Sequence, residues 1–394
     1  MDYDTIIVGA GAAGMMCAAY SSRRTLVIDH AKAAGEKIRI SGGGRCNFTN
    51  LGTLPGNFLS KNPHFCKSAL KRYTQWDFLD LVGKHQIGWH EKTLGQLFCD
   101  LSAKQIVAML LQEMSDAGAE LWLKSSIRSV KHDGDRFVIL AERDGTQVSL
   151  TTRNLVLASG GKSIPKMGAS GFAYDIAQQF GLGMVETRPA LVPLTFVDQR
   201  YAPISGVSAP ARAFANGVSF EEAVLFTHRG LSGPAILQAS SYWKDGDEVV
   251  LDLDPDRTLF EALRSARQEQ GKRDVATILA QHYPTRLAQH IVAEMEFTGR
   301  IGDQSDRALD ATCAKIQNWA QRPTGSEGYR AAEVTLGGVD TDGVSSKTME
   351  AKTQKGLYVI GEALDVTGWL GGYNFQWAWS SGWAAGTAIA QSRN

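Results

Sequence analysis

Cysteines are few in this sequence, and they lack the spacings that metal sites and disulfide frameworks need. The 394 residues include five cysteines, which are scattered over the chain without any C-x-x-C pair. An odd and scattered set argues against a disulfide framework, a structural zinc site and a dithiol oxidoreductase. We therefore expect no bound metal, and we expect a reducing compartment, the cytoplasm.

Long apolar runs and an excess of charge are also missing. No run approaches the ~18–20 apolar residues of a membrane span, and no basic and apolar leader precedes the first predicted strand. Lys+Arg and Asp+Glu both number 41, so the formal net charge is zero. This balance gives no reason to expect nucleic acid or an anionic membrane as a partner, although it leaves a local basic patch open. The length fits two or three domains.

The first twenty residues carry the clearest motif. Residues 5–8 are a β-branched run, residues 9–14 have the spacing G-x-G-x-x-G, and residues 15–20 are mostly small and apolar. This order predicts a strand, a glycine turn and a helix. Gly9 would make the turn, Gly11 would let a diphosphate approach the backbone, and Gly14 would let the helix pack on the strand. The helix N-terminus would point free N–H groups at the phosphates.

An acidic residue follows at a matching distance. A second predicted strand, residues 25–28, ends in Asp29, twenty residues after Gly9. An acid at about this separation binds a ribose hydroxyl in dinucleotide sites. The alternative is a plain βαβ unit with a surface aspartate, but strand, turn, helix and acid all fall in register.

Residues 35–47 are rich in glycine and make a poor strand and a poor helix. Three successive glycines lie between Ser41 and Arg45. The stretch is either a flexible loop or a backbone surface against a flat or anionic ligand, with Arg39 or Arg45 countering phosphate charge. We favour the ligand, because Arg, Cys and Asn alternate densely with these glycines.

The next hundred residues predict the rest of a mixed α/β domain. Seven apolar side chains have the spacing of a helical core: Phe65, Leu70, Tyr73, Trp76, Phe78, Leu79 and Leu81. A helix capped by Ser102 is expected over 102–117, and a parallel strand over 120–123. Three strands of a β-meander follow, at 126–132, 136–141 and 146–151, with Asp144-Gly145 as a hairpin turn.

A second junction of strand and glycine comes at residues 154–161, where a strand leads into Ser159-Gly160-Gly161. No complete second G-x-G-x-x-G unit accompanies it, so we expect no separate nicotinamide domain. A helix ending near Gly181 follows.

The composition shifts near Arg188 toward a β-rich insert. Prolines punctuate short predicted strands at 191–196, 211–215, 223–227 and 248–254, and residues 258–320 have mostly helical spacing. His228 and Arg229 precede a predicted helix over 235–242, where they could bind a carboxylate or move a proton. A lone histidine is, however, more often structural or solvated.

The C-terminal part returns to strands and glycine turns. Strands are expected at 334–339 and 356–361, and a long helix over 377–391 follows the sequence Gly371-Gly372-Tyr373-Asn374. Several separate glycine turns fit a long bipartite ligand such as FAD, which has a diphosphate, two sugars and a broad ring. NAD would need mainly the first unit.

These blocks together resemble the YhiN/BaiN-like flavoproteins, NAD(P)/FAD-dependent oxidoreductase homologues also described as aminoacetone oxidase-like. The resemblance covers nearly the whole chain and is most specific at Gly-Gly-Arg-Cys-Asn (43–47) and Gly-Gly-Tyr-Asn (371–374). It implies an α/β fold: a glutathione-reductase-type, Rossmann-like FAD-binding domain (1–187 and 332–394). A β-rich inserted domain (188–254) and a small helical inserted domain (255–331) would interrupt it.

The resemblance also implies roles for single residues. The diphosphate would be held by Gly9, Gly11, Ala13 and Gly14, the ribose by Asp29 and the adenine by the backbone of Ile127. The stretch from diphosphate to flavin would follow Ser41, Gly43, Gly44 and Arg45. The ribityl chain and the flavin ring would lie against Gly361, Asp365, Gly372, Asn374 and Phe375. The predicted cofactor site further includes the neighbours of these segments: Ala12, His30, Lys37, Arg39, Cys46, Asn47, Ala158, Ser159, Gly160, Glu362 and Tyr373.

One segment departs from the family pattern. Residues 95–99 are Gly-Gln-Leu-Phe-Cys, where Gly-Arg-x-Phe-Pro is expected. The change removes a cation and a rigid turn, which points to a divergent subgroup.

The leading functional hypothesis is an FAD-dependent oxidoreductase that transfers a hydride between flavin N5 and a small organic substrate. We expect non-covalent FAD, with NAD(P)H as a transient electron donor, and we take His228, Arg229 and Tyr373 as candidates for proton transfer or substrate anchoring. One alternative is an RNA-modifying flavoprotein, which the zero net charge and the lack of a basic-aromatic run weaken. The other is a flavin-binding sensor or partner protein without turnover. We expect no nucleic acid and no membrane as partners, and the oligomeric state stays open.

Overall fold

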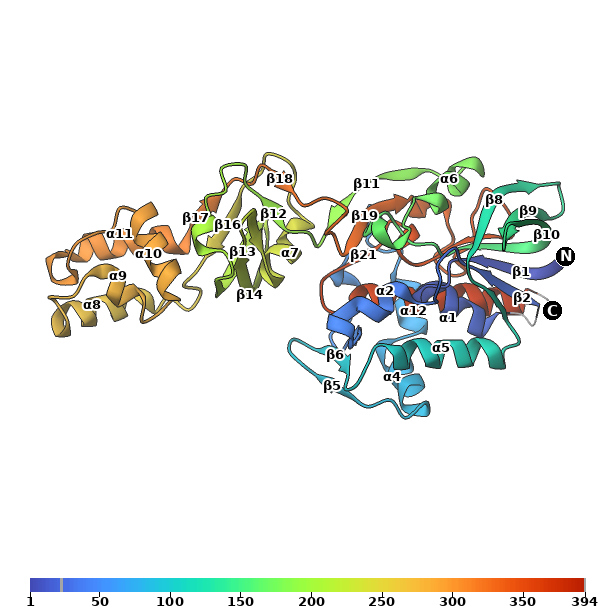
Figure 1. The fold of residues 1–394 in the computed structure, drawn as a ribbon, viewed down its shortest axis with the longest axis horizontal. Helices are drawn as coiled ribbons and strands as arrows, with labels where there is room; N and C mark the ends of the chain where they lie inside the picture. Colours follow the sequence, from blue (N-terminus) through green and yellow to red (C-terminus); the bar gives the residue numbers. More distant parts are fainter. Residues whose placement is uncertain (22–23, 393–394) are drawn as a thin grey trace. The chain divides into compact units, whose positions relative to one another are not determined.

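The structure, a computed structural model, describes residues 1–21 and 24–392 and divides into two compact units (Figure 1). One unit consists of Met1–Pro189 with Val334–Asn394, and the other of Ala190–Glu333. The first unit is discontinuous in sequence, because the second is inserted between strands β11 (Met184–Ala190) and β19 (Val334–Val339), which pair with each other.

A seven-stranded mixed sheet forms the centre of the first unit. Strand β1 (Asp2–Val8), helix α1 (Ala12–Tyr20) and strand β2 (Thr25–Ile28) make the predicted βαβ unit, and β1 and β2 are parallel. The strand order is β7-β2-β1-β10-β9-β8, with β20 also paired to β10. The α/β class and the Rossmann-like arrangement expected from the sequence are thus confirmed. The remaining strands of this sheet are β7 (Glu120–Trp122), β8 (Ser125–His132), β9 (Phe137–Arg143), β10 (Thr146–Leu157) and β20 (Leu357–Val359).

Strand β10 corrects the prediction of two separate strands at 146–151 and 154–158. The two form one strand, which has β1 along one edge. Its other edge is shared, because residues 146–152 pair with β9 and residues 155–157 pair with β20. The meander β8–β9–β10 is therefore continuous with the parallel part of the sheet.

Helices of the first unit gather around α1, which packs on α12 (Tyr373–Gln391) and on α5 (Lys104–Asp116) (Figure 1). Helix α5 begins two residues later than predicted. Ser102 does not cap it, although its hydroxyl accepts a hydrogen bond from the Lys104 N–H. The predicted helical core at 65–81 forms α3 (Lys67–Arg72) and α4 (Gln75–Lys84), but Trp76 is 55% exposed and does not belong to the core.

The glycine-rich stretch, predicted to make a poor strand and a poor helix, does form helical turns, which corrects that prediction. It contains helix α2 (Glu36–Ile40) and a 3-10 turn over Ser41–Gly44, and it leads into β3 (Asn47–Asn50). Strand β3 pairs with β6 (Gln96–Cys99), which pairs with β5 (Trp89–Glu91). The first unit is completed by β4 (Phe58–Leu59), α6 (Phe172–Gln179) and β21 (Thr367–Gly368).

The second unit combines a seven-stranded antiparallel sheet with helices. The predicted strands correspond to β12 (Leu194–Thr195), β13 (Ser208–Ala215), β14 (Val218–Phe226) and β16 (Val249–Asp252). Sequence reasoning missed three short strands: β15 (Gly230–Ser232), β17 (Trp319–Gln321) and β18 (Gly325–Ser326). The helices are α7 (Pro234–Ser240), α8 (Leu259–Glu269), α9 (Val275–Leu279), α10 (Thr285–Glu294) and α11 (Asp306–Gln317).

Sheet and helices of the second unit share one hydrophobic cluster, which runs from Leu194 to Trp319. The division of this unit at residue 254 into a β-rich and a helical domain stays a prediction. Across the described residues, no helix is long and apolar enough to cross a membrane, and no group of three or more His, Cys, Asp or Glu side chains could hold a metal ion.

Small residues bring α1 and α12 into close contact. A Cβ atom added to Gly382 would lie 2.6 Å from the carbonyl oxygen of Ala13, and one added to Gly386 would lie 2.5 Å from that of Cys17. Both distances are too short for a side chain, so the two helices approach each other through their backbones.

Glycine-to-alanine substitutions can test the close contact of α1 and α12. At a crowded glycine the added methyl group should destabilise the fold, whereas at an open helical glycine it should only raise the helix propensity. We expect Gly382→Ala to lower the free energy of unfolding by about 1–3 kcal/mol, because α12 must move away from α1. Gly83→Ala in α4, where an added Cβ would meet nothing within 4 Å, is the matched control and should raise it by up to about 1 kcal/mol. Urea unfolding measures both. Equal unfolding midpoints for the two variants would contradict the close packing.

Candidate functional site

Many of the predicted cofactor residues lie at one edge of the first unit's sheet, where β1, β2, β10 and β20 end. The chain leaves β1 at Gly9 and β10 at Ala158, and these two segments touch: a Cβ atom at Gly9 would lie 2.5 Å from the Ala158 oxygen. Gly9 also has a φ of +112°, which a side chain would strain. Ligands of open α/β sheets bind outside the carboxyl ends of parallel strands, and this is such an edge.

Open space lies in front of Gly11, at the start of α1. An added Cβ there would meet nothing within 4 Å, and the φ of −85° is ordinary, so no feature of the protein itself requires a glycine. The first turn of α1 leaves N–H groups without an intrahelical acceptor. Gly43 has the same open surroundings. The site therefore has room and donors for the diphosphate of a dinucleotide, and the residues present fit FAD.

Asp29 is held by the backbone of the glycine turn. Its Oδ2 accepts a hydrogen bond of 2.6 Å from the Ala10 N–H, and its Oδ1 accepts one of 2.8 Å from the Ala31 N–H. The carboxylate is thereby fixed at the end of β2 beside the turn. The neighbouring His30 is exposed, and its ring covers Gly168: a Cβ there would lie 1.9 Å from Nε2.

Lys37 and Glu362 meet in a polar network beneath the same edge. The Lys37 Nζ donates to Glu362 Oε2 (2.9 Å) and to Ser163 Oγ (2.6 Å), and the Ser163 hydroxyl donates to Glu362 Oε1 (2.9 Å). The Thr335 N–H also donates to Glu362 Oε1, at 2.9 Å. Burial alone would raise the pKa of Glu362, but the charge and hydrogen bond of Lys37 and the donors from Thr335 and Ser163 hold it below its ordinary value.

Sequence reasoning missed two members of this network, Ser163 and Thr335. The Thr335 hydroxyl accepts hydrogen bonds from the N–H groups of Lys162 (2.8 Å) and Ser163 (3.1 Å), so it joins β19 to the segment that follows β10. The nearest signal in the sequence is the glycine pair at 160–161, which marks the turn but not the hydroxyls beside it.

Between α2 and β3, some predicted cofactor residues bond to the backbone, one is exposed and one is buried. Arg39 Nε donates to the Ala34 carbonyl (2.9 Å) and the Ser41 hydroxyl to the Ile38 carbonyl (2.8 Å), whereas Arg45 is exposed. Cys46 is fully buried, and burial raises the pKa of its thiol. A buried protonated thiol is a packing group rather than a nucleophile.

The start of α12 carries the predicted residues of the flavin end. Asn374 fixes the preceding turn: its side chain accepts from the Gly368 N–H and donates to the Gly368 carbonyl, both at 2.8 Å. Phe375 stacks on Trp379 with 5.6 Å between ring centres. Asp365 accepts from the Lys61 N–H at 2.7 Å, and burial raises the pKa of its carboxyl.

Four other predicted cofactor residues lie on or directly after strands of the central sheet. Ile127 lies on β8, at an irregularity of the pairing with β9. Ala158, Ser159 and Gly160 follow β10 directly, and the Ala158 N–H donates to the Val8 carbonyl.

The three predicted catalytic residues do not form a cluster within either unit, as far as the chain is described. His228 and Arg229 are exposed on the turn between β14 and β15, where Arg229 Nη1 pairs with Glu327 at 2.9 Å. Tyr373 belongs to the other unit, at the first position of α12, with its ring edge-to-face against Phe58 and Trp369.

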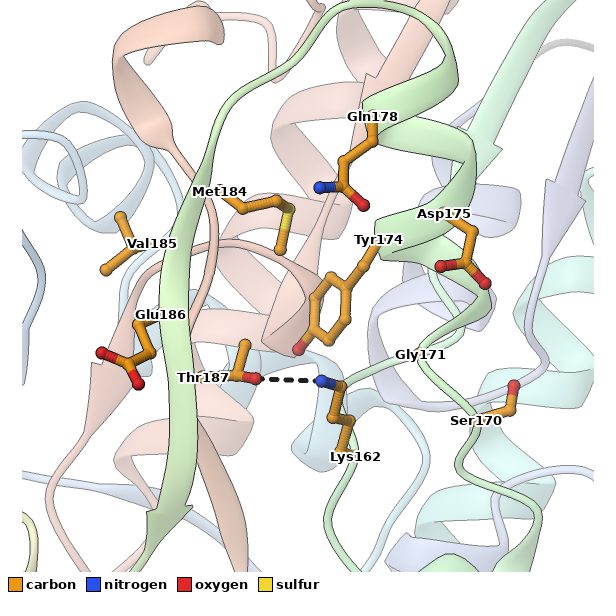
Figure 2. A pocket seen from close by; sticks show the side chains of 10 residues that line it. All are labelled: Lys162, Ser170, Gly171, Tyr174, Asp175, Gln178, Met184, Val185, Glu186 and Thr187. Carbon is orange, nitrogen blue, oxygen red and sulfur yellow. Dashed lines mark hydrogen bonds between the residues drawn. The ribbon is translucent and has the colours of Figure 1, made fainter.

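A separate pocket of about 420 Å³ lies between α6 and β11 (Figure 2). Figure 2 shows Lys162 reaching across it to the Thr187 hydroxyl, a hydrogen bond of 3.1 Å, with the Tyr174 ring beside it. No predicted site residue lines this pocket. Its lining residue Lys162 donates its backbone N–H to Thr335 of the polar network, but the pocket is distinct from the candidate site.

A diphosphate site at Gly11 predicts loss of flavin on substitution there. We expect Gly11→Val to fold normally but to retain at least about tenfold less FAD, since a loss of ~1.4 kcal/mol in binding already weakens the affinity tenfold. Gly56→Val, also at a glycine with open surroundings, is the control and should keep its flavin. The absorbance of purified protein measures both. Full flavin content in Gly11→Val would refute this location.

The pair of Lys37 and Glu362 predicts a pH-dependent contribution to stability. Because the pKa of Glu362 is lowered in the folded state, its contribution is present above the ordinary value of 4.5 and is lost as the pH falls through the folded value. Lys37→Met should cost about 1–3 kcal/mol at pH 7, less than breaking a fully buried pair, because Lys37 is about one-third exposed.

The double variant Lys37→Met/Glu362→Gln is the control for this pair and should recover part of the loss. Urea unfolding at pH 7 and at pH 4 tests both statements. A cost for Lys37→Met that is the same at both pH values would contradict the coupling.

Comparison with known proteins identifies a family and full-length relatives. The HI0933-like protein Rossmann domain matches residues 3–388. The chain is 50% identical to a ribosomal RNA dihydrouridine synthase of Escherichia coli, covering 100% of this chain and 99% of that protein, and 45% identical to one of Haemophilus influenzae, covering 98% of each. It is 27% identical to a 3-dehydro-bile acid delta(4,6)-reductase of Clostridium scindens, again over 98% of each.

Solved structures share the fold at low sequence identity. A 3-ketosteroid-delta4-(5alpha)-dehydrogenase of Rhodococcus jostii has a TM-score of 0.54 at 13% identity, covering 99% of this chain and 97% of that one. The FrdA chain of Escherichia coli quinol fumarate reductase has a TM-score of 0.52 at 15% identity, covering 99% and 70%. These similarities concern the fold alone.

Proposed function

Because the chain belongs to the HI0933-like protein Rossmann domain family, we propose that it is an FAD-dependent reductase of uracil in ribosomal RNA. The observation that carries the proposal is the 50% identity, over the whole of both chains, to a protein named ribosomal RNA dihydrouridine synthase. The predicted resemblance to the YhiN/BaiN-like flavoproteins and the predicted class, an FAD-dependent oxidoreductase, are confirmed at the level of the family.

The substrate that we propose differs from the small molecule favoured by the sequence and agrees with the RNA-modifying alternative. Zero net charge weakened that alternative, but net charge describes the chain as a whole and does not exclude a local RNA-binding surface. Ribosomal RNA also fits the predicted cytoplasmic location.

For the cofactor we propose non-covalent FAD at the sheet edge described above. The turn at Gly9–Gly14 and the start of α1 would hold the diphosphate, Asp29 the ribose, and the start of α12 the flavin end. When bound, FAD would carry the hydride, and NAD(P)H would reduce the flavin again. The network of Lys37, Glu362 and Ser163 would keep the segments around this site in place.

The chemistry of uracil defines what the protein must add. Its C5=C6 double bond is conjugated with the C4 carbonyl, so reduction places a hydride on C6 and a proton on C5, while negative charge develops on O4. The protein must therefore supply a proton donor near C5 and a hydrogen-bond donor near O4. Tyr373 is our candidate for one of these tasks, since it belongs to the same unit as the cofactor residues. The predicted role of His228 and Arg229 in proton transfer or substrate anchoring stays a prediction.

A second candidate function is the reduction of a small unsaturated ketone. The relative named 3-dehydro-bile acid delta(4,6)-reductase favours it, at 27% identity over the full length. The bond reduced would again be an alkene conjugated with a carbonyl, so both candidates need the same groups from the protein.

The proposal predicts formation of dihydrouridine in ribosomal RNA. We expect the purified protein with FAD and NAD(P)H to convert uridine to dihydrouridine in ribosomal RNA from a strain that lacks this modification, seen as a gain of two hydrogens by nucleoside mass spectrometry. Gly11→Val should abolish the product, and Tyr373→Phe should slow it by about 10²–10⁴-fold if Tyr373 moves the proton.

An unmodified RNA in the presence of reduced flavin would contradict the proposal. Turnover of a conjugated steroid ketone instead would establish the second candidate.

A further inference from the structure

Acidic residues are missing from a long segment of the first unit. From residue 37 to residue 76 the chain has no Asp and no Glu, although 41 acids in 394 residues would place about four in a stretch of this length. The same forty residues contain seven Lys and Arg residues. In a chain without net charge, this concentration of positive charge needs a physical reason.

The candidate cofactor site accounts for the first three of these cations. Lys37 pairs with Glu362, Arg39 donates to the Ala34 carbonyl, and Arg45 lies on the stretch expected to meet an anionic cofactor. The four others lie further along, at or near α3 (Lys67–Arg72). Of these, Lys61 touches the proposed cofactor site through its backbone N–H, which donates to Asp365.

Lys61 differs from the other three, because its charge is already compensated. Its Nζ lies 2.8 Å from Asp340 Oδ2 and 3.6 Å from Asp342 Oδ2. The uncompensated charge is therefore on α3 itself.

Lys67 and Lys71 present two like charges on one face of α3. They are four residues apart and exposed, while Ala69 and Leu70 between them are buried. Like charges at this spacing destabilise a helix by a few tenths of a kcal/mol. Neither lysine forms an ion pair within the part of the chain that the structure describes. An external anion would relieve this repulsion.

Arg72 holds the segment of a further cation, Lys347, next to α3. Its Nη2 donates a hydrogen bond to the carbonyl of Lys347, and its guanidinium lies 5.4 Å from the ring centre of Trp383 on α12. Arg72 thereby holds the segment around Lys347 beside α3, and the Lys347 side chain is exposed there. We call Lys67, Lys71, Arg72 and Lys347 the α3 patch.

We propose that the α3 patch binds the phosphate backbone of RNA. Lys67, Lys71 and Lys347 are exposed and form no ion pair with any residue that the structure describes, while the half-buried Arg72 fixes the Lys347 segment beside them. Such a group of cations suits a polyanion, and phosphate contacts position an RNA without reading its sequence. That this RNA is ribosomal rests on the proposed function. The patch would supply the local positive charge that the chain as a whole lacks.

Salt-dependent binding tests the patch. Fluorescence anisotropy of labelled ribosomal RNA fragments, titrated with FAD-loaded protein at several salt concentrations, gives the affinity and its salt slope. We expect Lys67→Gln/Lys71→Gln to weaken binding on the order of tenfold and to reduce the slope by about 1.5, the value for two lost phosphate contacts. Lys67→Glu/Lys71→Glu should weaken it further.

The matched control is Lys104→Gln/Lys131→Gln, which removes two other exposed lysines of the same unit and should change neither quantity. Flavin content and the thermal midpoint of all variants check that the fold is kept. An equal loss in the control and in the α3 variant, or an unchanged slope in the α3 variant, would overturn the proposal. The proposal would also be overturned if the α3 variant bound RNA as the wild type does but lost binding to phosphatidylserine-rich vesicles. The patch would then be a membrane surface.

Failure of the patch can be distinguished from failure of the proposed function. If the wild-type protein forms dihydrouridine and the α3 variant binds RNA as tightly as it does, the patch is wrong and the function stands. If no dihydrouridine forms but RNA binding depends on Lys67 and Lys71, the patch stands and the function is wrong.

Discussion

Backbone contact at the start of α1 is the constraint on which the candidate site depends. A Cβ atom at Gly14 would lie 1.9 Å from the Gly9 oxygen, so the helix begins directly against the turn that precedes it. At the other side of α1, Gly382 brings in the backbone of α12, where an added Cβ would lie 2.6 Å from the Ala13 oxygen. Helix α1 is thus fixed between the sheet edge and α12, which is why its free N–H groups point to a defined place.

The polar network around Glu362 joins segments that the chain separates widely. Lys37 lies 325 residues from Glu362 in sequence, and Ser163 lies 199 residues from it. A carboxylate in this setting is stabilised only while its partners are in place. The network therefore couples the position of α2 to the turn after β20.

Local features were predictable from the sequence, and distant pairings were not. The glycine turn, Asp29 and the β-meander follow from short patterns with a physical cause in the backbone. The sequence does not show that the Ser163 N–H and the Thr335 hydroxyl meet, because no local pattern marks a contact between residues 172 positions apart. Apolar spacing likewise placed Trp76 in the core, although only the neighbours of a side chain decide whether it is covered.

Charge illustrates the same limit on a larger scale. The balance of 41 basic and 41 acidic residues weakened the RNA-modifying alternative. A sum over the chain, however, carries no information about how the charges are distributed. Phosphate recognition, however, acts over about one Debye length, roughly 10 Å, so only the charges on one face matter. A segment of forty residues without an acid can therefore meet a polyanion while acids elsewhere keep the protein neutral. A chain with zero net charge can thus have one surface that binds RNA. The positions of the acidic residues are a better guide to such a partner than the net charge.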